Sequence, residues 1–474
     1  MKHIKVVIVL LIMTSLSSCG EDFLDPVPTS SISAENFYQN EEQLVAGIIN
    51  MYDGLQGVND TRSDSNHATQ MEFYVTEMRS DNTRTKNGEG EAAQFDNFEV
   101  RPTNGLVADH YRSFYNVIFR ANTVLANLSV ASEENRAKFE AEAKFVRAYV
   151  YFNLVRLYGE VPLVDRVIGI NDTDISYTRR SLTDVYDLII SDLEAAVEHL
   201  DNTYRNRASK AAAQALLAKV YLTLGTDHLE AQLLLEDVMA SGYSLEPNFY
   251  DVFYNENNSE VIFSIGYVSG QADDSQNFSA EWLNGVGRTV GVNYVTNDAV
   301  EALNNLGGNR TDVSIRTDPV QPSQTQVTKY LPDGADGGAN GRTFDFDARL
   351  AGNDWIVLRY ADVLLMHVEA IMADGSETSV PAALNSFQLV RDRAGLTDPV
   401  TNITKQELLD ERRVELAFEN QRLFDLIRFG VAVETLSAFA AETGGSFSST
   451  DLLLPIPQGE IGLSNGRLSQ NPGY

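Results

Sequence analysis

Residues 133–163, EENRAKFEAEAKFVRAYVYFNLVRLYGEVPL, are the stretch that decides the fold of this chain. Large apolar residues recur in it every three or four positions, as Phe145 and Tyr149 do. This spacing predicts a helix over about 133–158 with one buried side. Gly159 and the proline shortly after it end the pattern, because glycine favours a helix C-terminus and proline cannot continue a helix. A helix of this length needs neighbouring elements to cover its apolar side.

Similar patterns on both sides predict further helices at short intervals. Ser33 is the expected N-cap of the first of these helices. The expected helices cover about 33–55, 106–128, 181–200, 208–225, 228–241, 354–373, 380–394, 404–419 and 421–430. Helix pairs joined by short loops are typical of tetratricopeptide-like arrays, and residues 218–247 are most similar to one such repeat. No strict period of about 34 residues runs through the chain, so we expect a degenerate array.

The rest of the chain predicts irregular structure on this helical scaffold. Short β segments are expected around 260–268 and 452–456. Residues 306–352 are rich in Gly, Asp, Pro and Thr, which predicts a long irregular insertion, and such loops often carry ligand contacts. No low-complexity tract divides the chain. We therefore expect a mainly α-helical fold in which residues 33–474 form a single domain.

The first residues have the layout of a secretory signal peptide. Two lysines precede eight consecutive apolar residues, 6–13, a run too short to span a bilayer. The single cysteine, Cys19, follows closely, so no intrachain disulfide can form, and a free thiol or an intermolecular bridge is the alternative to modification. Residues 16–19, LSSC, resemble a bacterial lipobox. We therefore expect a signal peptide over 1–18, lipidation of Cys19, and a lipid-anchored tether over 19–32.

The composition is that of a folded and strongly acidic protein. Hydrophobic residues make up 43% of the 474 residues, which is enough to form a sizeable core. Asp and Glu number 67 against 36 Lys and Arg, so the formal net charge is -31. Because such a charge repels nucleic acid and anionic surfaces, we expect no nucleic-acid partner.

The sequence lacks the motifs of common catalytic and metal sites. No two of the six histidines lie within four residues of each other, and neither a nucleophile elbow nor a phosphate-binding loop occurs. Residues 333–337, DGADG, have the acids and glycines of some calcium loops but lack the ligand spacing and the closing glutamate. Asp345 and Asp347 could complete a calcium site only if the chain folded back. We therefore expect no cofactor, and a solvated turn is favoured over calcium binding.

A series of sequence blocks resembles the SusD/RagB family. The blocks, in order, are 147–149, 151–152, 157–163, 358–366, 369–370, 390–391, 393–396, 411–413, 415–419, 422, 454–457 and 470–474. Each block alone is only moderately specific, but the ordered set runs from about residue 21 to the last residue. The resemblance implies a helical lipoprotein in the outer membrane that faces the cell exterior. It also implies a SusC-like TonB-dependent transporter as partner and an oligosaccharide or polysaccharide as ligand.

Two regions outside the expected helices hold the residue types that a glycan site needs. Sugar rings stack on aromatic faces, and their hydroxyls bond to amides, carboxylates and arginines. In SusD-like proteins the segment before the helix that carries Tyr111 often supplies ligand contacts, as do loops after the middle β segment. The candidate ligand-binding residues are Asp81, Asn82, Arg84, Phe95 and Asn97, and Trp282, Arg288 and Tyr294. For Trp282 a stacking platform and core packing are equally open, and for Phe95 and Tyr294 packing is favoured.

The sequence therefore favours a surface glycan-binding lipoprotein that delivers its ligand to a SusC-like transporter, and not an enzyme. Residues 411–422 hold many acids, but every acid has an arginine nearby, so structural ion pairs are favoured there over a catalytic carboxylate pair. Peptide uptake, as in RagB-like relatives, and a helical-repeat scaffold without a small ligand are the alternatives.

Overall fold

A computed structural model describes residues 37–57, 68–86, 90–169, 171–204, 207–256, 258–271, 274–284, 292–331 and 350–474 of the chain. The predicted signal peptide, Cys19 and the tether lie outside the described residues. So do Ser33, Arg288 and the acidic segment 333–337. The division into a signal peptide, a tether and one domain over 33–474 therefore stays a prediction.

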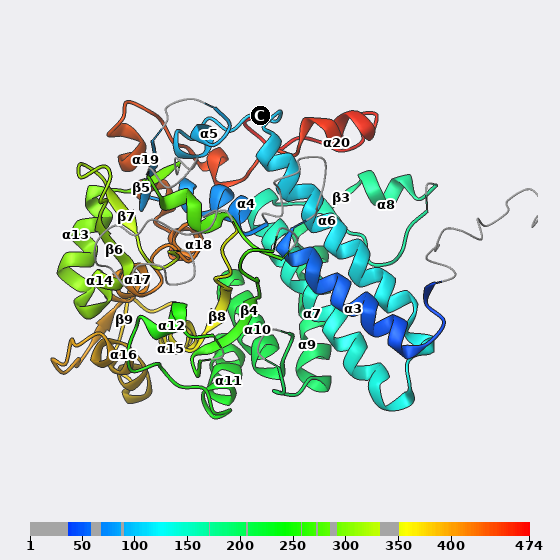
Figure 1. Ribbon diagram of the computed structural model, residues 1–474, viewed down its shortest axis with the longest axis horizontal. Helices are drawn as coiled ribbons and strands as arrows, with labels where there is room; N and C mark the ends of the chain where they lie inside the picture. Colours follow the sequence, from blue (N-terminus) through cyan, green and yellow to red (C-terminus); the bar gives the residue numbers. More distant parts are fainter. Residues whose placement is uncertain are drawn as a thin grey trace, which may run out of the picture.

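Antiparallel helical hairpins form the main body of the molecule, and Figure 1 shows them side by side from α3 to α16. These helices are α3 (Glu41–Gln56), α6 (Gly105–Ala126), α7 (Glu133–Tyr158), α9 (Leu182–His199), α10 (Lys210–Leu224), α11 (His228–Met239), α15 (Tyr360–Met372) and α16 (Pro381–Arg393). In the array α6 packs on α3 and α7, α7 packs on α9, and α11 packs on α10 and α15. The expected mainly α-helical, tetratricopeptide-like fold is confirmed.

Local sequence explains why these helices form where they do. The Ser132 side chain caps α7 by accepting a hydrogen bond from the backbone N–H of Asn135. The same helix stops at Gly159, which has a φ of 71°, a conformation that favours glycine. In α10, alanines such as Ala212 and Ala215 are fully buried, so neighbouring helices can approach closely.

Shorter elements connect and cover the array. The other helices are α4 (Ala68–Val75), α5 (Ala93–Asp96), α8 (Thr173–Tyr177), α12 (Asp251–Tyr254), α13 (Asn297–Leu306), α14 (Thr311–Ser314), α17 (Lys405–Glu415), α18 (Arg422–Arg428), α19 (Ala432–Ala441) and α20 (Gln458–Leu463). Single turns of 3-10 helix are η2 (Glu77–Arg79), η3 (Leu128–Val130), η4 (Phe278–Trp282), η5 (Gly308–Arg310) and η7 (Ser449–Leu452). No helix within the described ranges is long and apolar enough to cross a lipid bilayer.

The strands are short and pair two by two in antiparallel ladders. The pairs are β1 (Thr83–Thr85) with β5 (Asn293–Val295), β2 (Val161–Pro162) with β3 (Arg179–Arg180), β4 (Val261–Ile265) with β8 (Trp355–Arg359), β6 (Ile315–Thr317) with β7 (Thr325–Val327), and β9 (Glu377–Thr378) with β10 (Ile403–Thr404). The expected β segment around 260–268 is confirmed by β4.

Several sequence predictions of secondary structure are wrong. The helix expected over 33–55 begins only at Glu41, with Asn40 as its N-cap, and the helix expected over 404–419 already ends at Glu415. The helix expected over 354–373 begins only at Tyr360, because the five residues before it form β8 and pair with β4. The β segment expected at 452–456 is absent: Leu452 ends a 3-10 turn, and Leu454 donates a single backbone hydrogen bond to Leu157 O at 2.7 Å.

A buried network of ion pairs lies where β8 ends. The Arg359 guanidinium is 2.6 Å from Glu415 and 2.7 Å from Glu419. It also contacts Glu260 at 2.8 Å. The same network includes Arg310, Lys329, Arg393 and Glu411, all of them buried. Because a buried charge needs a partner, these contacts hold α17 against β8. The acids of residues 411–422 do form structural ion pairs, as expected, but with bases from distant parts of the chain and not with the arginines beside them in the sequence.

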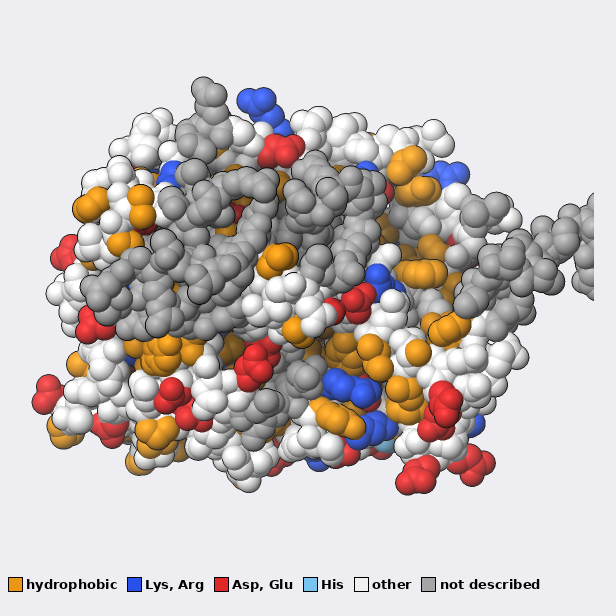
Figure 2. Space-filling view, viewed as in Figure 1, with side chains coloured by type: hydrophobic (Ala, Val, Ile, Leu, Met, Phe, Trp, Pro, Cys, Tyr) orange, Lys and Arg blue, Asp and Glu red, His pale blue; other side chains and the backbone are white. Residues whose placement is uncertain are grey.

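The outer surface carries both charged and apolar groups. Figure 2 shows acidic side chains spread around the drawn face rather than gathered in one place. Hydrophobic side chains gather on the right-hand side of the same face, over α6 and its neighbours. On this face the acidic charge is therefore distributed and not gathered in one patch.

Candidate functional site

The structure brings the two predicted site regions together. Strand β1 pairs with β5, so Arg84 lies directly opposite Tyr294. Beside this ladder the Lys86 Nζ donates to Asn284 Oδ1 at 2.9 Å, and the Asn284 amide donates to Asp318 Oδ2 at 2.8 Å. The sequence resemblance therefore identified two segments that are distant in the chain and adjacent in space.

Most of the predicted side chains in the first region nevertheless point into the protein. Asp81 is 4% exposed and forms a bidentate pair with Arg422, with distances of 2.7 and 2.8 Å. Arg422 and Arg413 hold the pKa of Asp81 down at about 2, against the upward effect of burial. The Asn82 amide donates to Glu77 Oε1 at 2.9 Å and accepts from Arg413 Nε at 3.0 Å. These contacts give Asp81 and Asn82 structural roles, which corrects their assignment as ligand contacts.

Arg84 and Phe95 need the same correction. Arg84 is buried, lies 3.3 Å from Asp96 and donates to Phe439 O at 2.8 Å. Its guanidinium also lies 3.4 Å from the centre of the Phe439 ring. Phe95 has no exposed surface, and its ring lies nearly parallel to the Tyr74 ring, with ring centres 6.3 Å apart. Neither side chain offers a free face to a ligand in this structure, and the packing interpretation of Phe95 is the one that fits.

Trp282 is a core residue. It is 1% exposed, and its indole packs edge-on against Phe73, Phe278 and Phe418 with ring centres 4.7, 6.1 and 5.8 Å away. A ring enclosed in this way cannot stack on a sugar, so core packing accounts for Trp282 and the platform alternative does not. Only Asn97 and Tyr294 among the described candidates keep partly exposed side chains, and their role in binding stays a prediction.

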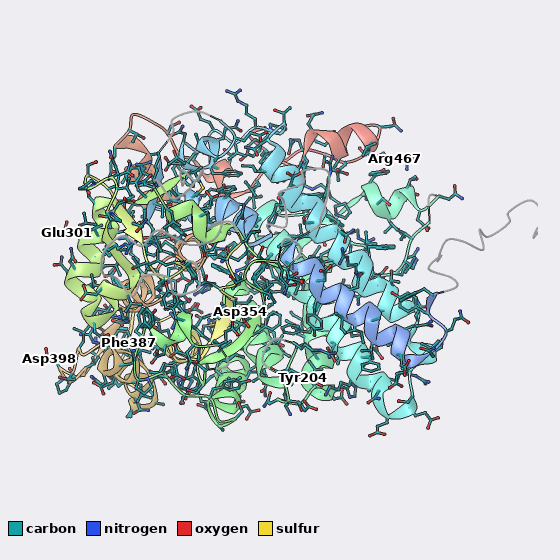
Figure 3. The ribbon with its side chains drawn as sticks, viewed as in Figure 1. Tyr204, Glu301, Asp354, Phe387, Asp398 and Arg467 are labelled. Carbon is teal, nitrogen blue, oxygen red and sulfur yellow. The ribbon has the colours of Figure 1, made fainter. Side chains whose placement is uncertain are left out.

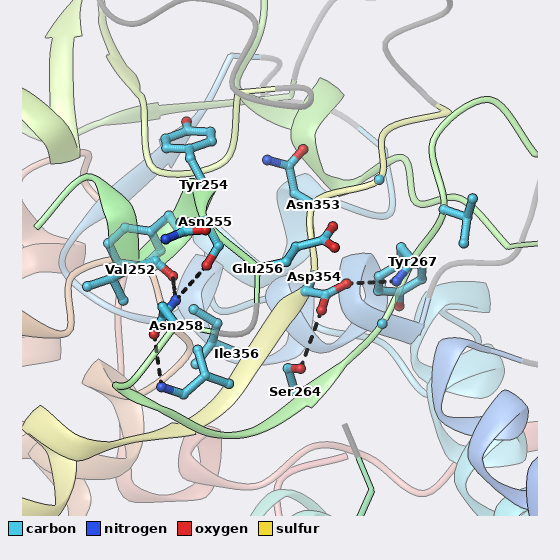
Figure 4. A pocket seen from close by; sticks show the side chains of 15 residues that line it. Val252, Tyr254, Asn255, Glu256, Asn258, Ser264, Tyr267, Asn353, Asp354 and Ile356 are labelled. Carbon is cyan, nitrogen blue, oxygen red and sulfur yellow. Dashed lines mark hydrogen bonds between the residues drawn. The ribbon is translucent and has the colours of Figure 1, made fainter. Parts of the chain in front are cut away.

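A separate polar cavity of about 560 Å³ lies between α12, β4 and the start of β8. Figure 3 shows one of its residues, Asp354, near the middle of the molecule. Figure 4 shows how the side chains of Tyr254, Glu256, Asn353 and Asp354 surround the space. Its volume is that of a typical small-ligand site, so this cavity is the candidate ligand-binding site.

Hydrogen bonds from one asparagine shape the wall of the cavity. The Asn258 amide donates to Val252 O at 3.0 Å and to Asn255 O at 2.9 Å. Its oxygen accepts from the backbone N–H groups of Glu260 and Val261 at 2.9 and 3.1 Å. The Asn258 side chain thus ties the end of α12 to the start of β4. Asn255 and Glu256, between these two elements, are exposed and line the cavity.

Bonds to residues 328 and 331 fix the part of the wall that Tyr254 and Asn353 form. The Tyr254 hydroxyl donates to Thr328 O and accepts from Leu331 N at 3.0 Å. Its ring stacks on Tyr250 with ring centres 4.4 Å apart. The Asn353 amide donates to Leu331 O at 3.0 Å. The cavity is therefore largely preformed.

Carboxylates dominate the electrostatics of this cavity. Asp354 accepts from Tyr267 N at 2.9 Å and from the Ser264 hydroxyl at 3.4 Å. Burial, and then the nearby Glu256, raise the pKa of Asp354 to about 6, although its two hydrogen bonds oppose the shift. No lysine, arginine or histidine lines the described cavity. Such a site suits an uncharged ligand that is rich in hydroxyl donors, and it repels anions.

Sequence reasoning did not single out the cavity residues. The signal was weak, since the segment 254–260, YNENNSE, is polar and stands beside the expected β segment. Asp354 and Asn353 meet it only through the pairing of β4 with β8, which are about 90 residues apart. Within the described part of the chain, no group of three or more histidine, cysteine or acidic side chains could hold a metal ion.

Two family models match the chain. One, described as "Starch-binding associating with outer membrane", matches residues 22–222. The other, described as "SusD family", matches residues 334–474. Together they cover most of the helical array and the C-terminal part of the fold, including β8, whereas α11 and the cavity residues 252–268 lie between the two matches.

Individual proteins are similar over the full length. A "SusD-like protein P2" of Formosa agariphila is 27% identical over 522 aligned residues, which cover 100% of both chains. A solved "Laminarin binding SusD-like protein" is 26% identical with a TM-score of 0.75, covering 92% of this chain and 100% of that one. A SusD superfamily protein from Bacteroides vulgatus is 21% identical with a TM-score of 0.78 over 92% of this chain and 100% of that one, which shows the same fold.

Proposed function

Since this chain belongs to the SusD/RagB family, we propose that it captures a neutral oligosaccharide or polysaccharide by binding and without catalysis. The observation that carries the proposal is the likeness, over the whole of that protein, to a structure described as laminarin binding. The description of the first family model as starch-binding supports the same ligand class.

The chemistry of the cavity supports a neutral ligand. Its acceptors are the carboxylates of Asp354 and Glu256 and the amide oxygens beside them, and sugar hydroxyls are donors that can bond to such groups. An anionic glycan would meet two acids and no base among the described lining residues. We therefore propose uncharged sugars over uronic acids or sulfated sugars.

Delivery to a transporter completes the proposed function. The family description associates these proteins with the outer membrane. The lipobox-like sequence that ends at Cys19 supports a lipid anchor that holds the protein at the exterior of the outer membrane. A SusC-like TonB-dependent transporter is the proposed partner, as the resemblance implies, and the captured glycan would pass to it without any bond being broken.

Isosteric changes in the cavity test the site. Asp354→Asn and Glu256→Gln should each weaken glycan binding about tenfold, because a hydrogen bond to a charged group contributes about 1.5–3 kcal/mol and 1.4 kcal/mol is tenfold in affinity. Isothermal titration calorimetry measures the change. The matched controls are Asp398→Asn and Glu301→Gln, both exposed and near the left edge of Figure 3, far from Asp354. Unchanged affinity in both cavity variants would contradict the cavity as the binding site.

Binding should also depend on pH through Asp354. Its pKa is raised to about 6 by burial and by Glu256, so the carboxylate is charged at about pH 7.5 and mostly protonated at about pH 5. Protonation removes a charge-assisted acceptor, so affinity should fall severalfold across this range. Because the pKa of Asp354 is raised on folding, the folded state binds more protons than the unfolded state, and protonation of this group favours folding as the pH falls. The expected loss of glycan affinity is therefore not caused by unfolding through Asp354. Titrations at the two pH values should show the loss in the wild type and a flatter response in Asp354→Asn.

A further inference from the structure

The two acids that line the cavity beside α12 have no positively charged partner. Asp354 accepts hydrogen bonds from Tyr267 N at 2.9 Å and from the Ser264 hydroxyl at 3.4 Å, and both donors are uncharged. Glu256 is exposed at the same cavity. Within the described part of the chain neither carboxylate forms an ion pair, and no lysine, arginine or histidine lines the cavity.

Other acids with little exposed surface in this protein are paired with bases. Asp81 lies 2.7 Å from Arg422, and Asp362 lies 2.7 Å from Lys219. Such pairing is the usual state of a carboxylate that is shielded from water. Asp354 differs from these two acids because its side chain borders an open cavity, so a cation that balances its charge can come from a ligand.

The two cavity carboxylates also act on each other. Burial raises the pKa of Asp354 to about 6, and the negative charge of Glu256 contributes to the rise. Figure 4 shows both side chains at the same space. A cation bound between them would relieve both the repulsion of like charges and the poor solvation of Asp354. A positively charged ligand is therefore favoured in this cavity over an uncharged ligand of the same shape.

The rest of the cavity wall indicates which kind of cation fits. A volume of about 560 Å³ is far larger than a single metal ion needs, and the described residues contain no group of three acids that could hold a metal. The amides of Asn255 and Asn353 and the ring of Tyr254 also line the space. Amides bond to hydroxyls, and an aromatic ring contacts either the C–H groups of a sugar or an ammonium group. A sugar ring that carries an ammonium group matches acids, amides and ring together.

We infer that the unit this cavity prefers is an amino sugar, whose ammonium group binds between Asp354 and Glu256 and whose hydroxyls bond to the amides of the wall. The inference rests on the proposed function and narrows it. The captured chain carries no acidic groups, and the unit in the cavity has a free amine. Neutral sugars bind the same cavity less tightly, and N-acetylation of the amine lowers the affinity because it removes the charge.

Three tetrasaccharides with the same β-1,4-linked backbone test the inference, because they differ only at carbon 2. Cellotetraose carries a hydroxyl there, the chitosan tetramer an ammonium group, and the chitin tetramer an uncharged acetamide. Calorimetry is performed on residues 20–474 at about pH 6.5, where an amine with a pKa of about 8 is protonated. The chitosan tetramer should bind at least about tenfold more tightly than either uncharged tetramer, because charge-assisted hydrogen bonds are the stronger ones.

Variants of the two acids show whether the cavity causes this preference. Asp354→Asn and Glu256→Gln each remove one charge and nearly keep the shape, so each should reduce the preference for the amine at least about threefold. The controls Asp398→Asn and Glu301→Gln change exposed acids outside the cavity and should keep the wild-type preference. Since the chain has a formal net charge of -31, attraction by the overall charge would respond alike to cavity and control variants.

The outcomes separate the inference from the proposed function. If cellotetraose binds as tightly as the chitosan tetramer, or the cavity variants keep the preference, the inference is overturned and the proposed function stands. If none of the three tetramers binds, the inference is overturned, and retardation by a neutral polysaccharide would still support the proposed function. Binding of the chitosan tetramer through Asp354, without retardation by any neutral glycan, would support the inference and contradict the neutral ligand.

A basic peptide is the other source of an ammonium group, and trilysine serves as its probe. We expect trilysine to bind at least about tenfold more weakly than the chitosan tetramer, since it lacks the hydroxyls that the wall amides would bond. Trilysine that binds as tightly as the chitosan tetramer and loses affinity in Asp354→Asn would make the cavity a site for basic peptides and overturn the inference.

Discussion

Replacing Glu415 by glutamine should lower the free energy of unfolding by about 3–5 kcal/mol, as expected when one partner of a buried ion pair is removed. Glu415 has no exposed surface. Its carboxylate lies 2.7 Å from Arg310 and 2.6 Å from Arg359 and also contacts Arg393. Glutamine has nearly the same shape as glutamate but no charge. The buried positive charges of Arg310, Arg359 and Arg393 would then be balanced by one negative charge fewer.

The protonation state of Glu415 supports this expectation. Burial by itself would raise the pKa of Glu415, but Arg393, Arg359 and Arg310 hold it well below its usual value. The acid is therefore charged throughout the physiological range, and its charge balances the network. Because the folded-state pKa is depressed, this contribution to stability is present above the unfolded pKa of about 4.3 and is lost only as the pH falls through the lower folded value.

Urea denaturation followed by circular dichroism measures the loss. Glu434→Gln is the matched control, because Glu434 is exposed on α19 and the same change there should alter stability by less than about 0.5 kcal/mol. If Glu415→Gln unfolds at the same urea concentration as the wild type, the network does not stabilise the fold in the way described.

Replacing Trp282 by alanine should also lower stability by about 3–5 kcal/mol, because truncating a buried aromatic side chain leaves a cavity. The indole packs against Phe73, Phe278 and Phe418, and its loss would remove one ring contact from each of them. The folded fraction of the variant should keep the glycan affinity of the wild type, since Trp282 does not line the cavity.

Two measurements on Trp282→Ala decide between core and platform. Thermal unfolding should show a lower midpoint than that of Tyr204→Ala, a truncation of an exposed ring. Calorimetry at a temperature where the variant is folded should show unchanged affinity. A variant that unfolds like the wild type but no longer binds glycan would restore the stacking role and contradict the packing described.

The helical part of the fold could be predicted from the sequence because it depends on local periodicity. The aromatic residues of α7 repeat at helical spacing, and its boundaries carry a serine cap and a terminal glycine. The segment before α15 could not be assigned in the same way, since Trp355, Ile356 and Val357 continue the apolar run of the helix. Only the pairing of β8 with β4 makes those residues a strand, and that contact is not local.

The site was less predictable than the fold for a physical reason. Residue type indicates what a side chain can do, but not whether it faces solvent. Asp81 and Arg84 have the right chemistry for a sugar site, yet each is used by an internal partner, Arg422 and Asp96 respectively. Conversely, Asp354 has no motif around it and gains its properties from the cavity that β4 and α12 build.

The most direct test of the central claim is native affinity electrophoresis of the wild-type chain, residues 20–474, in gels that contain one polysaccharide each. The panel pairs neutral laminarin, starch and xyloglucan with the anionic polysaccharides alginate and pectin, and casein-derived peptides are assayed in parallel by calorimetry. We predict retardation by at least one neutral glycan and by neither anionic one. Peptide binding without retardation by any neutral glycan, or retardation by the anionic polysaccharides alone, would contradict the account.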